Sequence, residues 1–176
     1  MRYSIAGMMN FNMFGIPHVG ADVCGFFQCP KDKPCFDEDQ QQEICGRWMQ
    51  LATFYPFARQ HRDLNGPSNE PYNLKEEFKT MATASIKERY KYLRFMYTCL
   101  ESAKSEANTC IDPLFYHFPN DERVYEDMEE SFMVGDVLKV TPFMDLKKEG
   151  QTTYEAYFPN GNWADMRDYS TLKVQN

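Results

Sequence analysis

The chain has 176 residues, of which 43% are hydrophobic and 15% aromatic, and a formal net charge of −7. This length suits about one domain, and the composition is that of a folded chain. The negative charge argues against nucleic acid or an anionic membrane surface as a partner, and no apolar run reaches the roughly 20 residues that span a bilayer. Residues 1–15 lack the cleavage site of a signal peptide.

The first predicted elements are a helix over residues 3–14 and a buried strand over residues 16–22. Asp22 ends that strand among small and apolar neighbours, and Phe26 follows it. A strand that ends by presenting a carboxylate and an aromatic ring is typical of sites at the C-terminal face of α/β barrels. The alternative interpretation is that Asp22 caps the next element and Phe26 belongs to the core.

Six cysteines are present, and four of them lie in one region with loop signals. The gaps between these four are four, five and nine residues, without a Cys-x-x-Cys pair, which argues against a zinc site but leaves it as a rival. Disulfides, which belong to oxidising compartments, are the favoured interpretation, although sequence alone does not fix their connectivity. The favoured pairs are Cys24–Cys45, Cys29–Cys35 and Cys99–Cys110.

A second helix is predicted over residues 38–54, because Ile44, Trp48 and Leu51 recur at helical spacing. A loop with a basic segment, residues 59–62, follows it. The longest helix is predicted from Asn73, whose spacing to Glu76 resembles a capping box, to about Ala107. Its stripe of apolar residues is predicted to be core: Leu74, Phe78, Met81, Ile86, Tyr90, Leu93, Tyr97 and Leu100.

The pattern changes after Cys110. Residues 113–118 are predicted to form a short strand, and the acidic residues 124–132 a connection with helical character. Three β segments with glycine turns between them are then predicted, over residues 137–143, 152–158 and 162–166. Helices therefore dominate the first two-thirds and strands the last third, which favours a domain boundary near residues 134–136.

Few residues have the spacing of a known catalytic motif. His18 and His117 are interpreted as structural, whereas His61 lies in a basic loop that suits either contact with a substrate or a solvated turn. Asp22 with Glu70 is one conceivable acid/base pair, but nothing in the sequence fixes their separation. Phosphate-binding glycine loops, Gly-x-Ser-x-Gly and His-Glu-x-x-His are all absent from the sequence.

Several segments resemble a known family. The most specific is Gly-Ile-Pro-His-Val-Gly-Ala-Asp-Val-Cys-Gly-Phe at residues 15–26, with Arg-Gln-His at 59–61. Taken together, the matching segments resemble glycoside hydrolase family 31, the retaining α-glucosidases that include lysosomal acid α-glucosidase and sucrase-isomaltase. The other matching segments, in the family's order, are residues 47–51, 54–57, 70–72, 90–93, 97–98, 113–115, 118–119, 132–136 and 157–163.

The resemblance implies an α/β fold in two parts. Residues 1–134 would be the C-terminal part of a (β/α)8 barrel, and residues 135–176 the first strands of a β-sandwich domain. The bridge Cys24–Cys45 matches the family's lysosomal members, although their loop is shorter and lacks Cys29 and Cys35. Together with the cysteine content, the resemblance implies a lysosomal or secreted protein.

The resemblance also implies roles for four side chains. Asp22 would hydrogen-bond the glucosyl unit bound in the −1 subsite or position its neighbours. Phe26 would form an apolar wall of that subsite, and His61 would donate to a sugar hydroxyl. Arg59 would contribute to substrate binding mainly by supporting its loop.

The family's catalytic carboxylates are missing from this sequence. The family carries its nucleophile in Trp-x-Asp-Met-Asn-Glu and its acid/base in Gly-Asp-Asn, and both are expected upstream of Met1. Retaining hydrolysis needs two carboxylates roughly 5 Å apart. The chain is therefore expected to need the remainder of the barrel, upstream or in a companion chain, to hydrolyse an α-glucoside oligosaccharide, without a metal or organic cofactor. The alternative hypothesis is a catalytically inactive sugar-binding or structural fragment.

Overall fold

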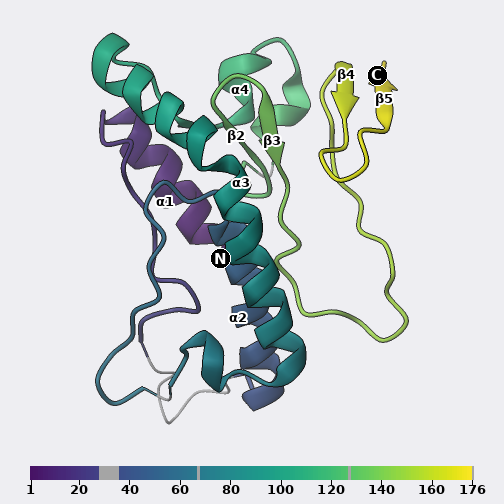
Figure 1. The fold of residues 1–176 in the computed structure, drawn as a ribbon. Helices are drawn as coiled ribbons and strands as arrows, with labels where there is room; N and C mark the ends of the chain where they lie inside the picture. The colour runs from purple at the N-terminus through teal and green to yellow at the C-terminus, as the bar shows by residue number, and fades with distance from the viewer. Residues whose placement is uncertain (28–35, 67, 127, 176) are drawn as a thin grey trace.

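A computed structural model describes residues 1–27, 36–66, 68–126 and 128–175, and shows helices gathered on one side and short strands on the other (Figure 1). The predicted bridge Cys29–Cys35 lies outside the described residues. None of the described helices is long and apolar enough to cross a membrane. The elements in chain order are α1 (Arg2–Met13), α2 (Glu38–Ala52), η1 (Pro71–Asn73), α3 (Glu76–Glu106), β1 (Ile111–Asp112), α4 (Leu114–His117), η2 (Glu122–Tyr125), β2 (Phe132–Val134), β3 (Leu138–Val140), β4 (Gly161–Ala164) and β5 (Thr171–Val174).

The predicted first helix is confirmed as α1. Its buried residues are Ile5, Met8, Met9 and Asn12, at the spacing of one helix face. The buried Asn12 side chain is hydrogen-bonded at both ends of its amide. Its amide nitrogen donates to the Met8 carbonyl at 2.9 Å, and its Oδ1 accepts from the backbone N–H groups of residues 110 and 111. Asn12 thereby attaches α1 to β1.

The predicted second helix is confirmed as α2, which ends two residues before the predicted limit. Asp37 and Gln40 form a capping box that satisfies backbone N–H groups at its start. At the other end, the guanidinium of Arg89 donates to backbone carbonyls of residues 52, 53, 55 and 56 at 2.6–3.2 Å. The first two carbonyls lie at the end of α2 and the other two in the turn that follows, so Arg89, which belongs to α3, caps α2 from outside.

The long helix is confirmed as α3, but two details of the prediction are wrong. The N-cap residue is Lys75, and the Asn73 side chain instead donates to Ser68 in the preceding loop. The predicted apolar stripe is not all core, because the buried face of α3 is Ala82, Ser85, Met96 and Cys99. Side chains in the middle of that stripe are exposed: Ile86 by 43%, Tyr90 by 71%, Leu93 by 39% and Tyr97 by 74%.

The strand predicted over residues 16–22 is not formed. Ile16 is 49% exposed, and the only regular pairing in this segment is an isolated parallel bridge between Asp22 and Arg59. A buried parallel strand needs neighbours on both sides. In the described structure this segment has a neighbour on one side alone, residues 57–63, so it stays extended but irregular.

An antiparallel sheet in the order β1-β2-β3 contacts α1 through β1. The prediction of a strand over residues 113–118 is wrong: the strand is β1, and the next residues form the short helix α4 after Pro113, whose fixed φ suits a helix start. Gly135, at φ 54°, makes the turn between β2 and β3, as its place between the predicted segments suggests. The bridge Cys99–Cys110 ties the end of α3 to this sheet.

The remaining strands form a hairpin, β4-β5, separate from the first sheet (Figure 1). β4 matches the strand predicted over residues 162–166, and β3 is a shorter version of the one over 137–143. The strand predicted over residues 152–158 is wrong, because these residues belong to none of the strands of the described structure. Trp163 of β4 packs against Phe118 and Phe158 at ring centroid distances of 5.9 and 5.4 Å.

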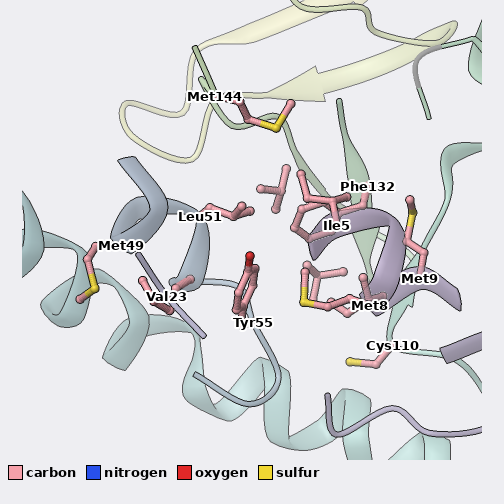
Figure 2. Packing of buried hydrophobic residues seen from close by; sticks show 14 of the residues in the cluster. Ile5, Met8, Met9, Val23, Met49, Leu51, Tyr55, Cys110, Phe132 and Met144 are labelled. Carbon is pink, nitrogen blue, oxygen red and sulfur yellow. The ribbon is translucent and has the colours of Figure 1, made fainter. Parts of the chain in front are cut away.

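The main core lies between α1, α2 and the first sheet, with Tyr55 near its centre (Figure 2). The Tyr55 side chain is fully buried, and its hydroxyl is hydrogen-bonded to Ser4 at 2.6 Å and accepts from Trp48 at 2.8 Å. Burial raises the pKa of Tyr55 to about 12. Val23 and Tyr55 are core residues that lie in or next to the two segments of the candidate site, residues 19–26 and 57–63.

Candidate functional site

Two extended segments, residues 19–26 and 57–63, run side by side and carry all four predicted substrate-binding residues. Three backbone hydrogen bonds join them: from Phe57 to Val19 at 3.1 Å, from Val23 to Arg59 at 2.9 Å and from Asp63 to Phe26 at 3.2 Å. Gly20 makes the close approach possible, because a Cβ at this position would lie 1.7 Å from the Phe57 carbonyl oxygen. The pairing therefore fixes the register of the two segments.

The first pair of predicted residues is an ion pair. Oδ1 of Asp22 accepts from Nε of Arg59 at 2.7 Å and lies 2.7 Å from its Nη2. The Asp22 side chain is 21% exposed and that of Arg59 51% exposed, so the carboxylate is partly sheltered while the guanidinium faces solvent. Charge-assisted bonds of this kind hold a carboxylate in one orientation.

The second pair consists of two rings. The rings of Phe26 and His61 lie 5.3 Å apart with an interplanar angle of 41°. Phe27 packs edge-on against Phe26 at 4.9 Å. The structure therefore places an apolar face and an imidazole together, on the same two segments as the Asp22–Arg59 pair.

A sharp turn connects Asp22 to Phe26. Cys24 and Gly25 both have left-handed backbone conformations, with φ values of 73° and 88°. Val23 is buried in the core, and the disulfide Cys24–Cys45 fastens the turn to α2. The bridges Cys24–Cys45 and Cys99–Cys110, which the sequence favours, are thus both present. Disulfide-bonded cysteines have no thiolate to offer a metal ion, so Cys24 and Cys45 are not available as ligands for the rival four-cysteine zinc site.

The other residues considered from the sequence have different partners. His18 packs against Phe57 with ring centroids 5.7 Å apart. Glu70 accepts from Ser68 and Asn73, and the Ser68 hydrogen bond lowers the pKa of the Glu70 carboxyl. A carboxyl that stays ionised is unsuited to protonating a leaving group. In the described part of the chain, no hydrogen bond joins Glu70 to Asp22.

His117 is paired elsewhere in the molecule. Its Nε2 lies 3.0 Å from Oδ2 of Asp112, whose side chain is 5% exposed. The hydrogen bond that His117 donates to the Asp112 carboxylate raises the pKa of His117, and the negative charge of Asp136 acts in the same direction. Because β1 carries Asp112 and α4 ends at His117, this pair is part of the framework around the first sheet.

Sequence reasoning missed Arg89 and Gln60, two residues that hold the site in place. Arg89 caps the end of α2 just before residues 57–63 begin, and burial lowers its pKa. Gln60 lies between the two predicted site residues of its segment, and its side chain contacts the Cys24–Cys45 disulfide. Arg89 could have been found as a charged residue beside the apolar positions of α3. Gln60 could have been found because side chains alternate between two faces along an extended segment, so its side chain points away from those of Arg59 and His61.

Both parts of the chain match sequence models of one enzyme family. Residues 1–99 match the "Glycosyl hydrolases family 31 TIM-barrel domain", and residues 107–176 match the "Glycosyl hydrolase family 31 C-terminal domain". The predicted fold class, part of a (β/α)8 barrel followed by the start of a C-terminal β domain, is confirmed by these matches and by the solved structures below.

The chain is also similar to known α-glucosidases. It is 36% identical over 170 residues to human probable maltase-glucoamylase 2, covering 96% of this chain and 6% of that protein. It is 35% identical over 167 residues to mouse lysosomal alpha-glucosidase, covering 95% of this chain and 16% of that protein. A crystal structure of the glucosidase II alpha subunit in a Glc1Man2-bound form superposes with a TM-score of 0.83 at 27% identity, over 99% of this chain and 18% of that one. The chain thus spans less than a fifth of each of these relatives.

Proposed function

Because the chain belongs to glycoside hydrolase family 31, we propose that it forms part of a retaining α-glucosidase. The substrate in this proposal is the terminal, non-reducing α-linked glucose of an oligosaccharide. The names of the maltase-glucoamylase and lysosomal α-glucosidase relatives support this substrate class. Residues 1–134 belong in this proposal to the barrel and residues 135–176 to the following β-sandwich.

The observation that carries the proposal is the pairing of Asp22 with Arg59 beside Phe26 with His61. A sugar offers hydroxyl groups at its edges and apolar C–H faces, so its site needs charged or polar acceptors and donors next to an aromatic wall. In the proposal the Asp22 carboxylate accepts from glucose hydroxyls, His61 hydrogen-bonds another hydroxyl and Phe26 forms the wall. Arg59 holds the carboxylate of Asp22 in its orientation.

The reacting carboxylates are proposed to come from outside these 176 residues. Retaining hydrolysis needs one carboxylate to attack the anomeric carbon and a second, about 5 Å away, to protonate the leaving oxygen. Asp22 is bound to a guanidinium and Glu70 to its own loop, so neither suits the acid role. The chain in isolation is therefore proposed to be inactive and to act with the remainder of the barrel.

The compartment in this proposal is the lysosome or the exterior of the cell. Two disulfides hold the described structure, and such bridges persist in oxidising environments. Mouse and rat relatives are lysosomal α-glucosidases.

The test is glucose release by the complete protein that contains this sequence. With maltose as substrate, proton NMR would show α-glucose as the first product if hydrolysis retains the anomeric configuration. Asp22→Asn should abolish most of this activity while leaving the protein folded. A folded complete protein that releases no glucose, but binds it in calorimetry through Asp22, would replace the proposal with the inactive sugar-binding alternative.

A further inference from the structure

Along residues 59–61, side chains point alternately to two faces. Arg59 reaches Asp22, and His61 packs against Phe26. Gln60 lies between them and reaches the other way, because successive side chains of an extended segment alternate between faces. The face opposite the candidate sugar site therefore carries one amide side chain.

That amide has three neighbours that anchor it. Nε2 of Gln60 donates to the carbonyl oxygen of Asn69, and it lies 3.2 Å from Sγ of Cys24 and 3.7 Å from Sγ of Cys45. Asn69 is 7% exposed, so its carbonyl oxygen has little access to water. A buried carbonyl oxygen without a hydrogen-bond donor costs free energy. The Asn69 carbonyl therefore favours the one orientation of the Gln60 side chain in which Nε2 donates to it.

These contacts join the parts that carry the site. Cys24 belongs to the turn between Asp22 and Phe26, while Cys45 belongs to α2. One glutamine side chain thus fastens the segment with Arg59 and His61 to the disulfide that holds the other segment.

We propose that Gln60 is a positioning residue for sugar binding: through the Cys24–Cys45 disulfide and the Asn69 carbonyl, it keeps Arg59 and His61 in register with Asp22 and Phe26. The inference rests on the proposed function for the nature of the ligand. Its structural part, the coupling of the two segments, is measurable without a substrate.

The test compares three variants of the complete protein: Gln60→Met, Gln60→Ala and the control Gln50→Ala. Methionine keeps the length of the side chain and its packing on the sulfurs but lacks the donor. Gln50 is an exposed residue of α2, so its truncation should change nothing. Hydrogen exchange is followed at the amides of Val23 and Asp63, whose bonds join the two segments.

Both Gln60 variants should speed exchange at these two amides about tenfold, the effect of losing about one hydrogen bond to a buried group, and leave exchange within α3 unchanged. The KM for maltose and the inhibition constant for glucose should rise about tenfold, with kcat changed less than about twofold.

If the amides of Val23 and Asp63 exchange in Gln60→Met at the same rate as in the wild-type protein, the positioning role is wrong. It is also wrong if exchange rates rise equally across α3, because that indicates general destabilisation. If the wild-type protein releases no glucose, the proposed function fails, and the exchange comparison still decides whether Gln60 couples the segments. Should Gln60→Ala fail to fold, Gln60→Met carries the same comparison alone.

Discussion

The carboxylate of Asp22 is matched by a guanidinium that comes 37 residues later in the chain. Because the Arg59 side chain is half exposed, water screens this pair, and its contribution to folding stability is small. Its main effect is on orientation: one oxygen of Asp22 is committed to Arg59. The pair therefore matters more for binding than for folding.

Asp22→Asn and Arg59→Ala should consequently differ in their effect on activity. Asp22→Asn removes the charged acceptor that binds the sugar and should lower kcat/KM about 100-fold, since a hydrogen bond to a charged group contributes about 1.5–3 kcal/mol. Arg59→Ala removes only the group that orients Asp22 and should lower kcat/KM about tenfold. Steady-state kinetics on maltose with the complete protein checks both values. A larger loss for Arg59→Ala would show that the guanidinium itself meets the substrate.

His117 should make stability depend on pH. Its pKa is raised in the folded protein by Asp112, so its contribution to stability is fully present below the unfolded value of about 6.5 and is lost as pH rises through the higher folded pKa. Denaturant unfolding of wild type and His117→Asn between pH 5 and 9 should therefore differ most at the acid end. A difference that grows with increasing pH would contradict this assignment.

At the scale of elements, the site depends on how α2 ends. Arg89 of α3 donates to the carbonyls of residues 52 and 53 at the end of α2 and to those of residues 55 and 56 in the turn that leads to residues 57–63. Arginine suits this place because its donors are held in a fixed geometry, while lysine offers a single compact charge. The packing of α2 on α3 therefore also sets where the segment with Arg59 and His61 begins.

Arg89→Ala should destabilise the complete protein by about 2–3 kcal/mol, because buried carbonyls lose a charged donor. Arg89→Lys should recover about half of that loss, since the ammonium reaches fewer of the carbonyls. Thermal and urea unfolding measure both changes, with the exposed Arg94→Ala as control. Equal stability of Arg89→Lys and wild type would mean that charge alone, and not the fixed geometry of the guanidinium donors, caps α2.

The elements that the sequence predicts correctly are those whose pattern is local. Helix α1 follows from a continuous apolar segment, and helices α2 and α3 follow from apolar spacing within each segment. The family follows from the motifs at residues 15–26 and 59–61. Partners distant in sequence do not leave such a pattern: nothing near Ile16 shows that it lacks a second neighbouring strand, and nothing near Tyr90 shows which helix face packs inward. The Asp22–Arg59 and Phe26–His61 pairs likewise depend on a register that only the folded backbone defines. The roles of these residues toward a sugar remain predictions.

At the scale of the whole molecule, large apolar side chains remain exposed on α1 and on the segment that leads to the candidate site. Tyr3 is 95% exposed, Phe14 80% and Ile16 49%, all on α1 or the segment that follows it. Large apolar side chains exposed to this degree are typical of a face that packs against another part of a protein, and open strand edges favour association. We expect the remainder of the barrel to cover this face.

The double variant Tyr3→Ser, Phe14→Ser should therefore act in opposite directions in two contexts. In the complete protein it should lower the free energy of unfolding by about 3–6 kcal/mol, because each buried ring contributes about 1.5–3 kcal/mol. In the isolated 176-residue chain the same rings face water, so the variant should leave the stability nearly unchanged and reduce self-association, as followed by light scattering and native mass measurement. If the double variant and the wild type are equally stable in the complete protein, this face is exposed to solvent there. If the isolated wild-type chain is monodisperse at 20.7 kDa, the exposed rings do not cause self-association.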